Sequence, residues 1–197
     1  LYSSDNPIGN ERWIDRVYPD GTWEANLFQF YRRVLPKLTS VLPMPFQIDE
    51  DTRIDETSTH IALREALINL CIHADYTVNA SLIISQYPNH IILSNPGALL
   101  ISRWQYRGGE SVCRNLSLQK MFTMFGKAEK AGSGVGKILQ GWSDQNWKRP
   151  YLRISNKPDK VELHLYLESI LPNEHKQKLY KIFGKDCQHW EPDKLMV

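Results

Sequence analysis

The residues best suited to chemistry are a glutamate and an asparagine four positions apart, in the run Arg64-Glu-Ala-Leu-Ile-Asn69. Residues at positions i and i+4 of a helix lie on the same face. There the Glu65 carboxylate could orient or deprotonate an attacking water, while the Asn69 oxygen ligates a magnesium ion that bridges phosphates. Such pairs are also common on solvated helix faces. Whether this pair belongs to a catalytic site therefore depends on the other motifs in the chain.

A second candidate is the glycine-rich run Gly132-Ser-Gly134-Val-Gly136-Lys137, which opens a predicted helix. Glycines leave backbone N–H groups accessible to phosphate oxygens, and a helix N-terminus adds a partial positive charge. Lys137 could add a full charge. The run nearly spells a Walker A loop, but Ala131 and Ile138 stand where that loop needs a glycine and a magnesium-ligating hydroxyl. We therefore interpret it as a phosphate cradle at a helix start.

Hydrophobic patterning predicts the elements that must position these residues. Apolar residues recur at helical spacing over residues 23–42, 60–74 and 134–143. The second helix is expected to start near Ser58 or Thr59, either of which could serve as its N-cap. Short β-rich runs form two expected hairpins, one over residues 80–93 and one over residues 151–167. We expect an α+β fold, a two-layer α/β sandwich whose mixed, mostly antiparallel sheet carries the helices on one face.

The long segment over residues 98–131 holds one predicted helix, residues 116–125, between stretches without periodicity. Long irregular segments in a compact domain are often functional, so we expect this one to cover a pocket between sheet and helices. Seven basic and two acidic residues lie between positions 103 and 137. This stretch is either solvated surface or a binding surface for phosphates or DNA.

Three motifs occur in the order found in the ATPases of gyrase, heat-shock chaperones, histidine kinases and mismatch-repair proteins (the GHKL group). The motifs are Arg64-Glu-Ala-Leu-Ile-Asn-Leu-Cys-Ile-His-Ala-Asp-Tyr76, Ser94-Asn-Pro-Gly97 and Glu129-Lys-Ala-Gly-Ser-Gly134. More specifically, they resemble REALxNAxxHRDY, NPG and EKxGSG of the RecG-like transcriptional regulators. The resemblance covers roughly residues 10 to 170.

This resemblance implies a GHKL (Bergerat) fold that binds ATP and Mg²⁺. It implies Glu65 as the catalytic carboxylate and Asn69 as the metal ligand. The nucleotide contacts that it implies are Asn95, Gly97, Gly132, Gly134, Gly136 and Lys137. Asn95 stands where the ATPase group has an acidic residue, and an amide lacks the charge and purely accepting character of a carboxylate. We therefore expect a degenerate pocket that binds nucleotide without efficient turnover, so that enzymatic activity stays an open question.

The resemblance also implies partners, because such domains commonly follow a Schlafen-type nucleic-acid-binding domain and precede a winged helix. After Pro172 the composition becomes lysine-rich with a helical pattern. We expect a GHKL-like domain over residues 1–172, the start of a truncated next domain over residues 173–197, and DNA contacts through flanking domains. The alternative is a structural or dimerising domain of a DNA-binding regulator, with a vestigial pocket and a homodimeric assembly.

Composition excludes several other classes of protein. The net charge is only +2, so the molecule as a whole does not strongly attract nucleic acid. No run approaches the roughly 18 apolar residues of a membrane span, and no signal peptide is visible, which predicts a soluble, cytoplasmic protein without membrane partners. The three cysteines are far apart and predict neither disulfides nor a zinc site.

His73 and Asp75 are either a proton-transfer pair or part of a helix end.

Overall fold

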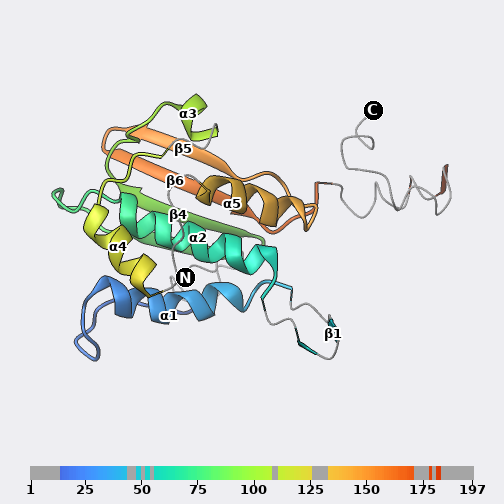
Figure 1. Cartoon of the computed structure of the whole chain (residues 1–197), viewed down its shortest axis with the longest axis horizontal. Coiled ribbons are helices and arrows are strands. Elements are labelled where there is room, and N and C mark those ends of the chain that lie inside the picture. The colour runs from blue at the N-terminus through green and yellow to red at the C-terminus, as the bar shows by residue number, and fades with distance from the viewer. Residues whose placement is uncertain are drawn as a thin grey trace.

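The computed structural model describes residues 14–43, 48–49, 52–53, 56–107, 111–125, 133–170, 178 and 181–182. Its main body is a four-stranded sheet with helices over one face (Figure 1). The expected α+β sandwich is confirmed. In the described ranges, no helix combines the length and the apolarity that a membrane crossing requires.

The sheet consists of two hairpins joined side by side. β3 (Ile83–Tyr87) pairs with β4 (His90–Pro96), and β5 (Tyr151–Asn156) pairs with β6 (Asp159–Tyr166). β4 and β6 lie next to each other, so the strand order is β3-β4-β6-β5. Every pairing in this sheet is antiparallel, which makes it simpler than the mixed sheet we expected.

Alternation along the central strands directs one face of the sheet toward the helices. Ile91, Leu93 and Leu165 are almost completely buried, and Leu93 lies opposite Leu163 in the register of β4 and β6. Successive side chains of a strand point to opposite faces, so this apolar set defines the inner face. It meets the central helix of the fold.

That central helix is α2 (Ser58–His73), which packs against β4 and also contacts α1, α4 and α5 (Figure 1). Its N-cap is Thr57, whose hydroxyl oxygen accepts a hydrogen bond from the His60 backbone N–H. The expected cap at Ser58 or Thr59 is therefore wrong. The reason is tertiary, because the Thr59 hydroxyl is buried and donates to the Gly141 carbonyl oxygen at 2.9 Å.

α5 (Gly134–Ser143) packs closely on α2 through small residues. A Cβ atom on Gly141 would lie 2.5 Å from Ala62 Cβ and 2.6 Å from the Ser58 carbonyl oxygen, so only glycine allows this approach. Trp142 is fully buried, and its indole N–H donates to the Tyr166 carbonyl oxygen at 2.7 Å. These contacts fix α5 to both the central helix and the sheet.

The remaining elements flank this centre. α1 (Leu27–Thr39) begins after its N-cap Asn26 and buries Tyr31 on the outer side of α2. In the order of the chain, α3 (Arg103–Arg107) and α4 (Leu116–Met124) come between β4 and α5. α4 confirms the helix predicted over residues 116–125. A short ladder joins β1 (Ile48–Asp49) and β2 (Thr52–Arg53). The domain boundary predicted near residue 172 lies outside the described residues.

Candidate functional site

A pocket of about 130 Å³ lies between α2, the inner face of the sheet and the start of α5. Residues 98–107 and 111–119, which we call the cover, supply a further wall from the segment between β4 and α5. The position of this segment over the pocket agrees with the prediction. Both apolar side chains and polar groups line the pocket.

At one end, the start of α5 meets the polar face of α2. A Cβ atom on Gly134 would lie 3.1 Å from Glu65 Cδ and 3.0 Å from Asn69 Nδ2, and still closer to a Glu65 carboxylate oxygen. Any side chain at position 134 would therefore clash with Glu65 and Asn69. Glu65, Asn69 and Gly134 all line the pocket, so three residues predicted from two separate motifs come together.

The other predicted residues of the glycine-rich run differ in position. Gly136 has open space where a Cβ atom would lie, and neither Gly136 nor Lys137 is among the residues that line the pocket. Gly132 lies outside the described residues. The phosphate contacts predicted for these three residues therefore stay predictions.

Gly97 is required by the path of the chain. Its φ of 101° favours glycine, and a Cβ atom there would lie 2.7 Å from Asp75 Cβ and 3.3 Å from an Arg114 guanidinium nitrogen. Its N–H donates to the Asp159 carbonyl oxygen at 2.9 Å. Gly97 thus allows the loop after β4 to pass close to Asp75 and Arg114. Gly97 itself does not line the pocket.

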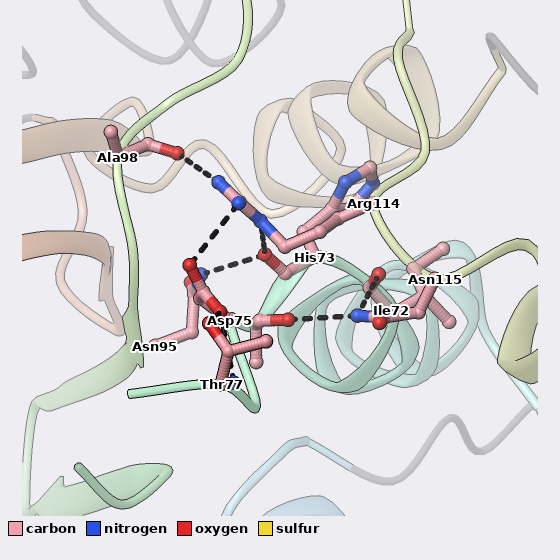
Figure 2. A network of polar contacts seen from close by, with 9 residues as sticks. Ile72, His73, Asp75, Thr77, Asn95, Ala98, Arg114 and Asn115 are labelled. Atoms are coloured by element: carbon pink, nitrogen blue, oxygen red, sulfur yellow. Dashed lines mark hydrogen bonds and ion pairs between the residues drawn. The ribbon is translucent and has the colours of Figure 1, made fainter. Parts of the chain in front are cut away.

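Asn95, near the end of β4, lines the opposite end of the pocket. Its side-chain Nδ2 donates to the carbonyl oxygen of His73, the last residue of α2, at 3.5 Å (Figure 2). Glu65 and His73 are eight residues apart on α2, which corresponds to about 12 Å along the helix axis. Asn69 lies halfway, about 6 Å from His73, so the two polar ends of the pocket are between one and two helical turns apart.

Arg114 joins this end of the pocket to the cover. Its Nε donates to the His73 carbonyl oxygen at 3.1 Å, one terminal nitrogen donates to the Ala98 carbonyl oxygen at 2.6 Å, and the other lies 3.4 Å from Asp75 Oδ2 (Figure 2). The last carbonyls of a helix lack partners within the helix. Arg114 therefore caps α2 from a distant part of the chain.

Asn115 continues this cap. Its Nδ2 donates to the carbonyl oxygens of Ile72 at 2.9 Å and Ala74 at 2.7 Å. Asn115 is also the N-cap residue of α4, but its side chain makes no cap hydrogen bond there because it is directed to α2. The sequence alone did not indicate these roles of Arg114 and Asn115. The only available signal was an arginine in a basic stretch followed by an asparagine before a predicted helix.

His73 and Asp75 belong to this helix end. Asp75 Oδ1 accepts from the Thr77 N–H at 3.0 Å and the Thr77 hydroxyl at 2.6 Å, and these bonds lower the pKa of Asp75, with a smaller contribution from Arg114. Burial, followed by the charge of Arg114, lowers the pKa of His73 and favours its neutral form. Within the described residues, no hydrogen bond joins the His73 ring to Asp75. The arrangement favours a helix end over a proton-transfer pair.

The aromatic residues of the cover have different surroundings. Tyr106 lines the pocket, and burial raises its pKa to about 12, so it stays an uncharged phenol at neutral pH. Trp104, in the same helix α3, has 79 % of its surface exposed. Of the two, only Tyr106 can contact a molecule in the pocket in this arrangement.

Comparison with known proteins finds a family match for part of this chain. Residues 79–165 match the family model described as "Putative ATP-dependent DNA helicase recG C-terminal". No curated protein matches the chain. The matched range contains Asn95 and Arg114 but begins after α2, so it does not include Glu65 or Asn69.

A solved structure supports the same fold. The DIP2311 protein from Corynebacterium diphtheriae superposes with a TM-score of 0.60 at 18 % sequence identity, over 80 % of this chain and 31 % of that chain. Identity at this level indicates the fold alone, and this chain spans less than a third of the length of that protein. Residues 79–165 of the chain therefore match a RecG-like, ATPase-type domain, as the resemblance of the motifs predicted.

Proposed function

We propose that this domain binds a nucleoside triphosphate, with ATP as the candidate, together with Mg²⁺. The phosphates would lie at the end formed by Glu65, Asn69 and Gly134, and the base at the end that contains Asn95. The observation that carries the proposal is the close approach of Gly134 to Glu65 and Asn69. At this point an acid, an amide and a helix N-terminus meet so closely that a Cβ atom at position 134 would clash with Glu65.

The character of the pocket fits such a ligand. Along α2, Glu65 and Asn69 lie about 12 Å and about 6 Å from His73. Apolar side chains such as Leu93, Ile138 and Leu163 line the same pocket. A nucleotide likewise combines a flat base, which can pack on apolar side chains, with a charged phosphate chain, and this likeness supports the ligand class.

The roles of the residues follow from their side chains. When bound, Mg²⁺ neutralises phosphate charge and takes oxygen ligands, which the Asn69 side chain can supply. The Glu65 carboxylate is the group that would orient or deprotonate a water. The N-terminus of α5, which begins at Gly134, favours negative charge. We propose binding with slow turnover, because Asn95 replaces the acidic residue usual in the ATPase group.

The size of the pocket supports an alternative. A volume of about 130 Å³ is smaller than the roughly 300–1,000 Å³ typical of ligand pockets. Nucleotide binding therefore requires the cover or the start of α5 to move outward. A domain in which this does not happen would have a vestigial pocket and a structural or dimerising role in a regulator.

The proposal also includes a link to gene regulation. The chain spans 31 % of the solved DIP2311 chain, so further domains are the natural place for DNA contacts. Arg114 and Asn115 anchor the second part of the cover, and we propose that the cover transmits ligand binding to such domains. If nucleotide does not change DNA binding by a protein that joins this chain to such domains, this part of the proposal is rejected.

The experiment that tests the proposal is isothermal titration calorimetry of the chain with ATP and MgCl₂. We expect heat of binding that depends on Mg²⁺ and weakens in Asn69→Ala. Absence of heat at millimolar ATP would reject nucleotide binding and favour the alternative. Light scattering without ligand then tests the dimerising version, which a monomer contradicts.

A further inference from the structure

We infer that Arg114 is a positioning residue that holds the Asn95 amide with its oxygen toward the pocket, so that the pocket prefers a purine with an amino group at position 6 over one with an oxygen there. This inference rests on the proposed nucleotide binding. It concerns which base is accepted and which residue outside the predicted motifs controls that choice.

The side-chain amide of Asn95 has a defined orientation. The His73 carbonyl oxygen is only a hydrogen-bond acceptor, so the end of the amide that faces it at 3.5 Å must be Nδ2 (Figure 2). An amide is planar, and its oxygen therefore lies on the other side, away from His73. In the described part of the chain, Oδ1 of Asn95 makes no hydrogen bond. Because Asn95 lines the pocket, this oxygen is the acceptor available to a ligand.

The position of His73 is also defined. Its carbonyl oxygen follows the last turn of α2, where no residue of the same helix can donate to it. Arg114 donates to this oxygen at 3.1 Å and to the Ala98 carbonyl oxygen at 2.6 Å. The guanidinium group thereby ties the end of α2 to the loop that follows β4, the strand that carries Asn95. The loop passes so near Arg114 that a Cβ atom on Gly97 would lie 3.3 Å from a guanidinium nitrogen.

The consequence of losing Arg114 follows from these contacts. The His73 carbonyl would lose its shorter hydrogen bond, and the end of α2 could separate from the loop after β4. The Asn95 amide would then be able to rotate, since only a 3.5 Å bond holds it. After rotation, either the oxygen or the nitrogen of the amide faces the pocket.

The chemistry of the base then gives the preference. A fixed acceptor oxygen can receive a hydrogen bond from the amino group of a 6-aminopurine. A 6-oxopurine instead presents an oxygen, so two acceptors face each other and neither is satisfied. Leaving a buried polar group without its partner is what makes hydrogen-bonding sites selective. A freely rotating amide can satisfy both bases and selects neither.

The test compares ATP with inosine triphosphate, which differs in having an oxygen at position 6, by titration calorimetry of the full chain with Mg²⁺. We expect ATP to bind about tenfold more tightly, the factor that corresponds to one hydrogen bond. In Arg114→Gln the ratio of the two dissociation constants should fall to near one. Arg114→Lys, which keeps the charge but loses the planar fork, should also lower the ratio and serves if the glutamine variant does not fold.

Two further variants separate positioning from general loosening. Asn95→Asp has two equivalent acceptor oxygens, so it should prefer ATP both alone and combined with Arg114→Gln. Asn115→Ala removes the neighbouring cap bonds to Ile72 and Ala74 but none to His73, so it should lower thermal stability and leave the ratio unchanged. A merely structural role of Arg114 would not produce rescue by Asn95→Asp.

The outcomes distinguish the two proposals. If the parent chain binds both nucleotides equally, or if Asn115→Ala lowers the ratio as much as Arg114→Gln, the inference is overturned and nucleotide binding stands. If the parent chain binds neither nucleotide, nucleotide binding itself is rejected, and the inference falls with it.

Discussion

Gly134, the first residue of α5, lies against the Glu65 carboxylate on α2, and Glu65 Cδ would be only 3.1 Å from a Cβ atom at position 134. This contact brings the glycine-rich run and the acidic helix face together at one end of the pocket. It also makes the geometry sensitive to a single methyl group.

We expect Gly134→Ala to destabilise the fold by about 1–3 kcal/mol, because the added methyl group must displace Glu65, Asn69 or the start of α5. Helix propensity alone would predict the opposite, a gain of roughly 1 kcal/mol. Gly136→Ala is the matched control, since a Cβ atom there meets open space and should be neutral or stabilising. Urea denaturation of both variants checks this, and equal stability of the two would contradict the packing described.

Glu65→Ala should abolish any ATP hydrolysis and largely spare nucleotide binding, because the carboxylate is assigned to the water. Asn69→Ala should instead weaken the Mg²⁺-dependent part of binding, because its side chain is assigned to the metal. Phosphate release and calorimetry measure the two effects separately. Glu56→Ala is the control, since Glu56 forms an ion pair with Arg64 and does not line the pocket. Parent-like hydrolysis in both Glu65→Ala and Asn69→Ala would refute these roles.

Asn115→Ala should lower the free energy of unfolding by about 1–3 kcal/mol, because it leaves the Ile72 and Ala74 carbonyl oxygens without the side-chain donor. Asn26→Ala, which removes the side-chain acceptor at the exposed start of α1, should cost roughly 0.5–2 kcal/mol. Hydrogen exchange provides a second readout, since only Asn115→Ala should increase exchange in the last turn of α2. Unchanged exchange there would show that the cap contributes little.

Stability should fall as the pH drops below about 6.5, the usual pKa of histidine. Burial lowers the pKa of His90 and of His164, with the charge of His164 adding to the shift of His90 and Glu162 opposing that of His164. Burial also lowers the pKa of His60 and His73. The unfolded chain therefore takes up more protons than the folded chain between the folded and the unfolded pKa values, so stability is complete above the unfolded value and is lost below it.

Denaturation curves between pH 8 and pH 5 measure this effect. Acidic side chains with lowered pKa values, such as Glu162 and Glu168, lose their contribution only at more acidic pH, so histidines dominate this range. In His164→Gln, the decrease in stability between pH 8 and pH 5 should be smaller than in the parent chain. A pH-independent parent would contradict the burial of these rings.

Local patterns in the sequence determined most of the elements of this protein. Apolar residues at helical or alternating spacing predicted α2, α4, α5 and the two hairpins, because these patterns record which side of each element meets the core. Motif order also predicted the type of domain, confirmed over residues 79–165. The boundaries were less accurate. α1 is shorter than the predicted residues 23–42 because Asn26 caps it. The Thr59 hydroxyl does not cap α2, because it donates its hydrogen bond to the Gly141 carbonyl oxygen.

Only the tertiary structure decided which polar groups meet. Arg114 and Asn115 cap the end of α2 from about 40 positions further along the chain, and a cap from a distant segment leaves no periodic signal near the helix that it completes. The same packing directs the Asn95 amide and selects Gly134, rather than Gly136, as the glycine that lines the pocket. Sequence patterns reflect the local balance of burial and backbone geometry, whereas these contacts depend on how complete elements pack against one another.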